Sequence, residues 1–170
     1  MKLNNFFKLI IAIVVCEFTG IVGSVFTMPS IPKWYAGLVK PALNPPTWAF
    51  GPVWTILFVL MGISVFLVYI KDEKTVLNEA EGQQLKSKKK IAIVIFAVQL
   101  VLNMLWSIIF FGLHNPAGAF VDIIFLWLAV LATIFVFYKI SKPTAWLLMP
   151  YIFWVSFAAY LDYAILMLNR

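Results

Sequence analysis

The chain has 170 residues, of which 64% are apolar and 12% are charged, and its mean hydropathy is +0.98. Soluble domains contain about 45–50% apolar residues, so this composition excludes an ordinary soluble fold and indicates that lipid covers much of the surface. The formal net charge is +6. The basic residues stand between apolar runs and form no strip interleaved with aromatics, so nucleic acid is not an expected partner.

Five apolar stretches are each long enough to cross a bilayer as a helix. At a rise of about 1.5 Å per residue, about 20 residues match a hydrocarbon core of about 30 Å. Lipid-exposed backbone must bond to itself, and these runs are too long and too uniformly apolar for barrel strands. The predicted fold class is an all-α integral membrane protein, a five-transmembrane-helix bundle with residues 1–170 in one domain. The predicted spans are about Phe6 to Met28, Trp48 to Ile70, Ile91 to Phe111, Gly118 to Lys139 and Thr144 to Leu168.

The lysines predict the orientation of the bundle. With five crossings, the amino terminus and the second and fourth loops share one side, which is expected to carry ten lysines, against three basic residues on the other side. The positive-inside rule then predicts a multi-pass protein with a cytoplasmic amino terminus and an outside carboxyl terminus, in a bacterial plasma membrane. The hydrophilic segment 71–90 is predicted to be a solvated cytoplasmic loop. The ten lysines are Lys2, Lys8, Lys71, Lys74, Lys86, Lys88, Lys89, Lys90, Lys139 and Lys142.

The first stretch also resembles a cleavable signal peptide, because Lys2 and Lys8 precede an apolar run. Glu17 interrupts that run, so a retained first helix is expected. The lone Cys16 excludes an internal disulfide and a cysteine-based metal site, and no metal-ligand spacing is present. His114 is the only histidine, and the sequence shows no set of residues suited to hydrolytic catalysis.

Residues that are unusual within a membrane gather in the outer half of the predicted bundle. Counting depth from the span ends places tryptophans, an amide and a carboxyl there from several helices. In the fifth span Trp154, Ala158 and Asp162 recur every four residues and share one face, and the small Ala158 leaves a gap for a flat ring. A polar cavity with aromatic walls is predicted. Its candidate residues by depth are Trp48, Trp54, Asn103, Trp106, Trp154, Ala158 and Asp162.

Structural roles are open for several of these residues. An ionisable group inside a span costs roughly 2.5 to 3.5 kcal/mol on insertion scales, so Glu17, Asp122 and Asp162 should face the bundle interior or an interface. Asp122, about one turn into the fourth span, also suits the amino-terminal turn of a helix, and Glu17 could pair across the bundle. Asn103 could bond a neighbouring helix. Trp34 and Trp48 could belong to an interfacial aromatic belt.

The first outer loop, residues 29–47, contains five prolines. Such a segment is stiff and cannot be a plain helix throughout. It is predicted to act as a lid over the cavity, with a static plug as the alternative.

Three motifs resemble one family. The segment Trp34 to Trp54, WYAGLVKPALNPPTWAFGPVW, is similar to the TspO/MBR family of tryptophan-rich sensory proteins, also called translocator proteins or peripheral benzodiazepine receptors. LNMLWSIIFFG from Leu102 to Gly112 and PYIFWVSFAAYLDYAILMLN from Pro150 to Asn169 resemble its third and fifth helices, and Asp122 stands where the family has an acidic residue. The resemblance implies a five-helix bundle, often dimeric. It also implies an outer pocket for porphyrins, sterols and drug-like aromatics, linked in bacteria to tetrapyrrole handling.

The resemblance implies a set of pocket residues by motif position, and one residue departs from the family pattern. Asp162 stands where an amide is common, which changes the charge of the pocket. Tyr163 and Arg170 lie one residue too far apart for the proposed sterol-recognition pattern. The implied set is Trp48, Trp54, Asn103, Trp106, Trp154, Ala158 and Leu161, and the ligand-binding prediction adds Trp34 and Asp162.

Three functions are weighed. The first is a receptor or sensor in which protoporphyrin IX, or another hydrophobic aromatic or sterol ligand, inserts between Trp54 and Trp154 and bonds Asn103 without any cofactor. The second is an enzyme that degrades porphyrin oxidatively in light, with Trp54 and Trp154 as redox partners. The third is a porphyrin or sterol transporter, which the lack of inverted repeats disfavours. A homodimer is expected, with Gly20 and Ser24 as a small-xxx-small pair.

Overall fold

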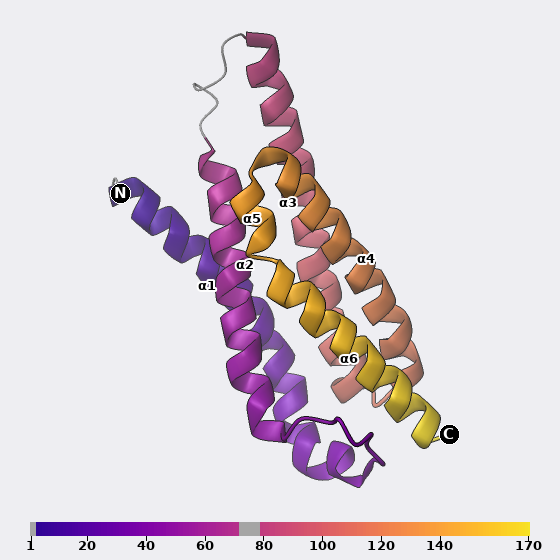
Figure 1. Cartoon of the computed structure of the whole chain (residues 1–170). Helices are drawn as coiled ribbons and strands as arrows, with labels where there is room; N and C mark the ends of the chain where they lie inside the picture. Colours follow the sequence, from indigo (N-terminus) through magenta and orange to yellow (C-terminus); the bar gives the residue numbers. More distant parts are fainter. Residues whose placement is uncertain (1–2, 72–78) are drawn as a thin grey trace.

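The computed structural model describes residues 3–71 and 79–170, which form helices joined by short connections (Figure 1). Five helical stretches within these residues are long and apolar enough to span a membrane. The predicted all-α, multi-pass membrane bundle is therefore confirmed. The elements are α1 (Leu3–Ser30), the π-helical turn η1 (Ile31–Tyr35), the 3-10 turn η2 (Thr47–Ala49), α2 (Phe50–Ile70), α3 (Glu79–Ser107), the π-helical turn η4 (Ile108–Gly112), α4 (Pro116–Ile140), α5 (Lys142–Trp146) and α6 (Met149–Leu168).

The first crossing is longer than the sequence predicted. Helical structure continues past Pro29 and through η1, so the candidate span is Asn4–Tyr35 and the irregular part of the predicted 29–47 loop is only residues 38–46. A proline removes one backbone donor, and a wider π-helical turn accommodates the break without ending the helix. The prediction of a loop from residue 29 is wrong for this reason.

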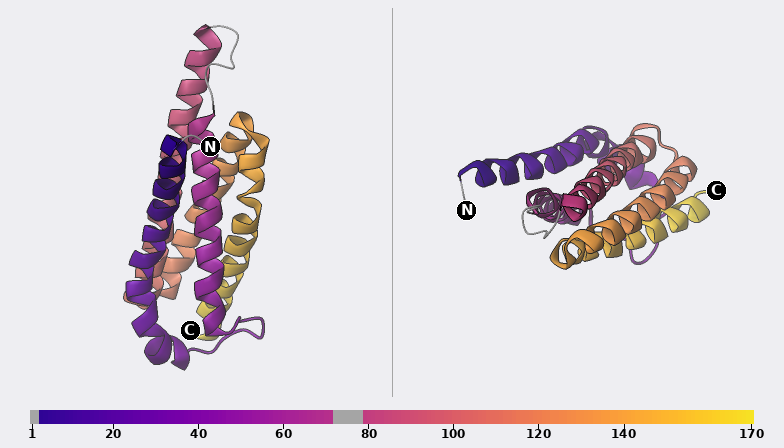
Figure 2. Two further views of the ribbon diagram at one scale, coloured as in Figure 1. Left: turned by 90° about the vertical axis from the view of Figure 1, so that its left-hand side faces the viewer. Right: turned by 90° about the horizontal axis from the view of Figure 1, so that it is seen from above.

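The third crossing begins earlier than predicted. α3 starts at Glu79, so residues 79–90, expected to be a solvated loop, are helical, and the rest of that loop, 72–78, lies outside the described residues, as does Lys2. Glu79 and Glu81 occupy the first turn, where carboxylates favour a helix, and the following Gln and Lys residues are good helix formers. The start of α3 projects beyond the ends of its neighbours (Figures 1 and 2).

The other two crossings also differ in detail. The fourth begins at Pro116, capped by Asn115, whose Oδ1 accepts from the Gly118 backbone N–H at 3.0 Å. The capping role considered for Asp122 therefore falls to Asn115. The fifth crossing is two helices, α5 and α6, because Pro150 at the start of α6 cannot continue a helical hydrogen-bond ladder.

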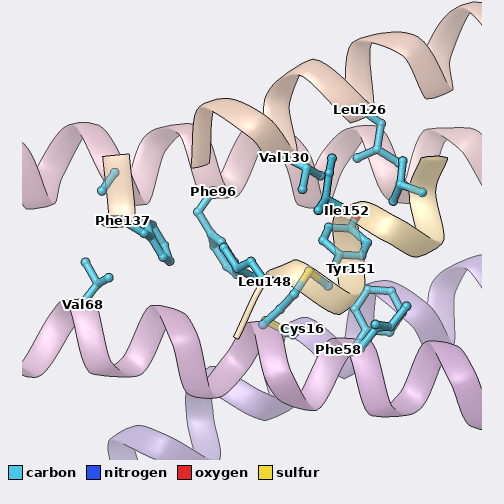
Figure 3. Packing of buried hydrophobic residues seen from close by; sticks show 14 of the residues in the cluster. Cys16, Phe58, Val68, Phe96, Leu126, Val130, Phe137, Leu148, Tyr151 and Ile152 are labelled. Atoms are coloured by element: carbon cyan, nitrogen blue, oxygen red, sulfur yellow. The ribbon is translucent and has the colours of Figure 1, made fainter. Parts of the chain in front are cut away.

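The buried core runs along the bundle where α3 packs on α4, α4 on α6 and α1 on α2. Figure 3 shows this cluster extending from Val68 and Phe137 at one end to Phe58 and Leu126 at the other. The first half of α1 leans away from the other helices (Figure 2). Large apolar side chains along α1 are exposed, including Phe18 at 62% and Val25 at 66%, as expected for a surface that lipid covers.

Candidate functional site

A cavity of about 490 Å³ lies in the half of the bundle that holds the first loop and the carboxyl terminus. This volume falls within the range of about 300–1,000 Å³ typical of small-molecule sites. α1, α2, α3 and α6 form its walls, and η1, η2 and η4 close it at the loop end. The predicted pocket residues that line it are Trp48, Trp54, Asn103, Trp106, Trp154, Ala158, Leu161 and Asp162, and Glu17 lines it as well.

Three tryptophans from three helices form one continuous wall. The Trp54 ring centroid lies 6.4 Å from that of Trp106 and 6.5 Å from that of Trp154, and Trp106 stacks on Phe110 at 5.5 Å. Trp54 and Trp154 meet edge to face at 88°. A ring was expected to insert between these two indoles. They already touch, so no ring lies between them. A planar ligand has to lie against the face of the cluster.

Two buried polar groups of the wall are held by partners, whereas the buried Trp154 Nε1 has no hydrogen-bond partner among the described residues. Asp162 is 2% exposed, and its Oδ2 accepts a hydrogen bond from Trp106 Nε1 at 2.6 Å. Asn103 is 4% exposed, and its Nδ2 donates to Tyr151 Oη at 2.9 Å. Satisfied buried groups of this kind fix side-chain orientation, so α3 and α6 present the tryptophan wall in a defined geometry.

The α1 wall carries the small or polar residues Glu17, Gly20, Ser24 and Thr27 beside the apolar Ile21 and Met28. A Cβ at Gly20 would lie 2.5 Å from Phe58 Cε2, so only glycine allows this approach of α1 to α2. Gly20 and Ser24 therefore line the cavity. That this pair also forms a dimer contact stays a prediction. Glu17 Oε1 has no hydrogen-bond partner in the described part of the chain.

Comparison with known proteins agrees with this architecture. The model of the TspO/MBR family matches residues 12–168. The chain belongs to the TspO/MBR family. Among its relatives it is 42% identical to the tryptophan-rich protein TspO of Chlorobaculum tepidum, with 95% of each chain covered. It is 36% identical to the translocator protein of Homo sapiens, over 85% of this chain and 79% of the other, and 33% identical to the tryptophan-rich sensory protein of Cereibacter sphaeroides, over 81% and 77%.

Two predicted residues of this TspO/MBR protein lie apart from the cavity. Trp34 stacks on His114 with ring centroids 4.5 Å apart and packs edge-on against Phe110, so it is not part of the lining. Asp122 is buried on α4, which contributes no lining residue among those described. Trp48 lies at the rim and is 75% exposed.

Several aromatic lining residues of this TspO/MBR pocket were not predicted from the sequence. Tyr35 closes the loop end, and its Oη donates to Asn44 Oδ1 at 2.7 Å, which ties η1 to the proline-rich segment. Phe58 and Phe110 also line the cavity. Tyr35 follows Trp34 directly in the family motif, which is the signal that could have found it. The phenylalanines carried no such signal, because the chain has 16 phenylalanines and residue type alone does not single out those of the cavity.

Loss of the Asp162 carboxyl should destabilise the bundle. Asp162→Ala leaves the part-buried Trp106 N–H without an acceptor, which costs about 1–3 kcal/mol. Asp162→Asn keeps an oxygen at the same place and restores the amide common in the TspO/MBR family, so it should cost less than half as much. Thermal unfolding of both variants in the same detergent checks this, and equal destabilisation by Ala and Asn would show that the Trp106 hydrogen bond is not the cause.

Proposed function

We propose that this chain is a membrane receptor or sensor that binds protoporphyrin IX, and related hydrophobic aromatic or sterol ligands, in the α1–α2–α3–α6 cavity. Membership of the TspO/MBR family supports a receptor or sensor role, and relatives carry the names translocator protein and tryptophan-rich sensory protein. The observation that carries the ligand class is the wall made by Trp54, Trp106 and Trp154. Large apolar surfaces with a few fixed polar groups suit flat aromatic ligands.

The charges of the lining restrict how such a ligand lies. Glu17 and Asp162 are the ionisable acids of the lining, and none of its described residues is Lys, Arg or His. The uncharged ring should therefore lie inside against the tryptophans. The propionates should lie at the loop end, where Lys40 Nζ stands 4.8 Å from the centre of the Tyr35 ring.

A dark titration tests the binding role. Adding protoporphyrin IX to the purified protein in the dark should quench tryptophan fluorescence saturably, because four indoles line the cavity. Under the receptor proposal, the porphyrin absorption bands of the complex stay constant when it is then illuminated. Unsaturable quenching, proportional to added porphyrin, would contradict binding at a defined site.

Light- and oxygen-dependent porphyrin degradation is the second candidate, with dioxygen as the oxidant. The contact of Trp54 with both Trp106 and Trp154 favours it, because touching indoles can pass an oxidising equivalent along the wall. Under this alternative, Trp54→Phe and Trp154→Phe should abolish protein-dependent bleaching of bound porphyrin and leave dark affinity within about twofold. Phenylalanine keeps an aromatic face and removes the oxidisable indole. Absorption spectra during illumination check this. Parallel loss of bleaching and binding would favour the receptor role alone.

A further inference from the structure

A second hollow, of about 990 Å³, lies at the opposite end of the bundle from the cavity. It is bounded by the start of α1, the end of α2 and the first half of α3. Five of its lining residues are lysines, and none of the described lining residues is Asp or Glu. We call it the lysine groove. It is lined by Asn5, Lys8, Tyr69, Ile70, Lys71, Gln83, Lys86, Ser87, Lys89, Lys90, Ile93 and Val94.

Three of the five groove lysines stand at the ends of the apolar runs. Lys8 directly precedes the long apolar run of α1, Lys71 directly follows that of α2, and Lys90 directly precedes that of α3. Each apolar run ends where the hydrocarbon ends, so these ammonium groups stand at the level of lipid headgroups. Below them Ile93 and Val94 continue the groove as an apolar surface.

The packing of the helices keeps the groove open. The first half of α1 leans away from α2 and α3, and α3 rises above both (Figures 1 and 2). Lys89 Nζ donates to the backbone carbonyls of Tyr69 at 3.2 Å and Lys71 at 2.5 Å, which fixes α3 against the end of α2. Lys8 Nζ stands 5.3 Å from the centre of the Tyr69 ring.

The helical start of α3 aligns charges in a way that the predicted loop would not. Gln83, Lys86 and Lys90 are three and four residues apart, so they share one face, and Val94 follows on it. Orientation by the positive-inside rule needs only lysines on the correct side. It does not need them gathered from three helices around one concave surface.

We propose that the lysine groove binds the headgroup of an anionic phospholipid, with phosphatidylglycerol as the probe, its phosphate among Lys8, Lys86 and Lys90 and its acyl chains along Ile93 and Val94. Basic pockets between membrane helices at the headgroup level have the chemistry to hold such lipids. The site is separate from the ligand cavity, because the two linings share no residue. If the groove did not bind this lipid, the receptor proposal would be unaffected.

Lipid titration of the full-length protein tests the proposal. The detergent-solubilised protein is titrated with phosphatidylglycerol and with phosphatidylcholine of the same acyl chains, and bound lipid is counted by native mass spectrometry. We expect phosphatidylglycerol to be retained at about one per chain and to be lost as salt rises, with phosphatidylcholine retained far more weakly. The full-length protein includes Asp72 and Glu73, the two acids that follow Lys71 in the sequence, so the measured affinity includes the effect of their charge. Equal retention of both lipids by the unaltered protein would overturn the proposal without any variant.

A matched pair of triple variants locates the site. Lys8→Gln/Lys86→Gln/Lys90→Gln should weaken phosphatidylglycerol binding by roughly 100-fold, at about fivefold for each lysine near the lipid surface. The control Lys88→Gln/Lys139→Gln/Lys142→Gln removes the same charge outside the groove lining and should lower affinity by less than about tenfold. Equal losses in the two variants would reduce the effect to general surface charge and overturn the groove as a site.

Discussion

Replacing Ala158 by leucine is expected to weaken protoporphyrin IX binding by on the order of tenfold or more. Ala158 lies on the cavity wall, one helical turn from both Trp154 and Asp162, and is 9% exposed. A larger side chain there occupies ligand volume, and overpacking a filled site costs about 1–3 kcal/mol. Dark quenching titrations of the variant and the unaltered protein measure the change in Kd.

Two further variants separate cavity filling from damage to the fold. Ala97→Leu makes the same change on an exposed face of α3 that does not line the cavity, and should leave Kd within about twofold. Ser24→Leu fills the cavity from the α1 wall and should weaken binding like Ala158→Leu. Unchanged affinity in both cavity variants would place the ligand elsewhere.

A single methyl group at Gly62 is expected to destabilise the protein by about 1–3 kcal/mol. A Cβ there would lie 2.6 Å from Ile13 Cα and 2.9 Å from Ile13 N, and these are backbone atoms that move only if α1 moves. Ile13 lies between the α1 residues of the lysine groove and those of the cavity, so this crossing of α1 and α2 separates the two sites. Thermal unfolding of Gly62→Ala measures the loss.

Gly82→Ala is the matched control for Gly62→Ala. Gly82 lies in α3, and a Cβ there would meet nothing within 4 Å. Alanine in a helix is more favourable than glycine by about 0.5–1 kcal/mol, so this variant should be as stable as the unaltered protein or slightly more stable. A Gly62→Ala protein as stable as Gly82→Ala would contradict the close crossing of α1 and α2.

Hydrophobic length made the bundle predictable, because a membrane helix must carry about 20 apolar residues. The ends of the helices were less so. Nothing apolar marks the continuation of α3 from Lys90 back to Glu79, since that part of the helix depends on propensity and charge. The extension of α1 through Pro29 and η1 depends on a π-helical turn, which sequence periodicity does not reveal.

Part of the cavity was also predictable, because polar and tryptophan side chains are rare within membranes and their depth can be counted. Trp54, Asn103 and Trp106 were predicted in this way, and they line the cavity. Trp34, which the ligand-binding prediction added separately, lies outside the lining because the π-helical turn places its side chain against His114. The contact of Trp54 with Trp154 was not predictable, since contacts between helices depend on how the helices cross.

The position of bound protoporphyrin IX tests the central claim most directly. A structure of the protein saturated with this porphyrin in the dark should show its ring in the α1–α2–α3–α6 cavity, against the Trp54–Trp106–Trp154 wall, with its propionates toward the loop end near Lys40. Porphyrin held in the lysine groove by its propionates, with the cavity unfilled, would contradict the account.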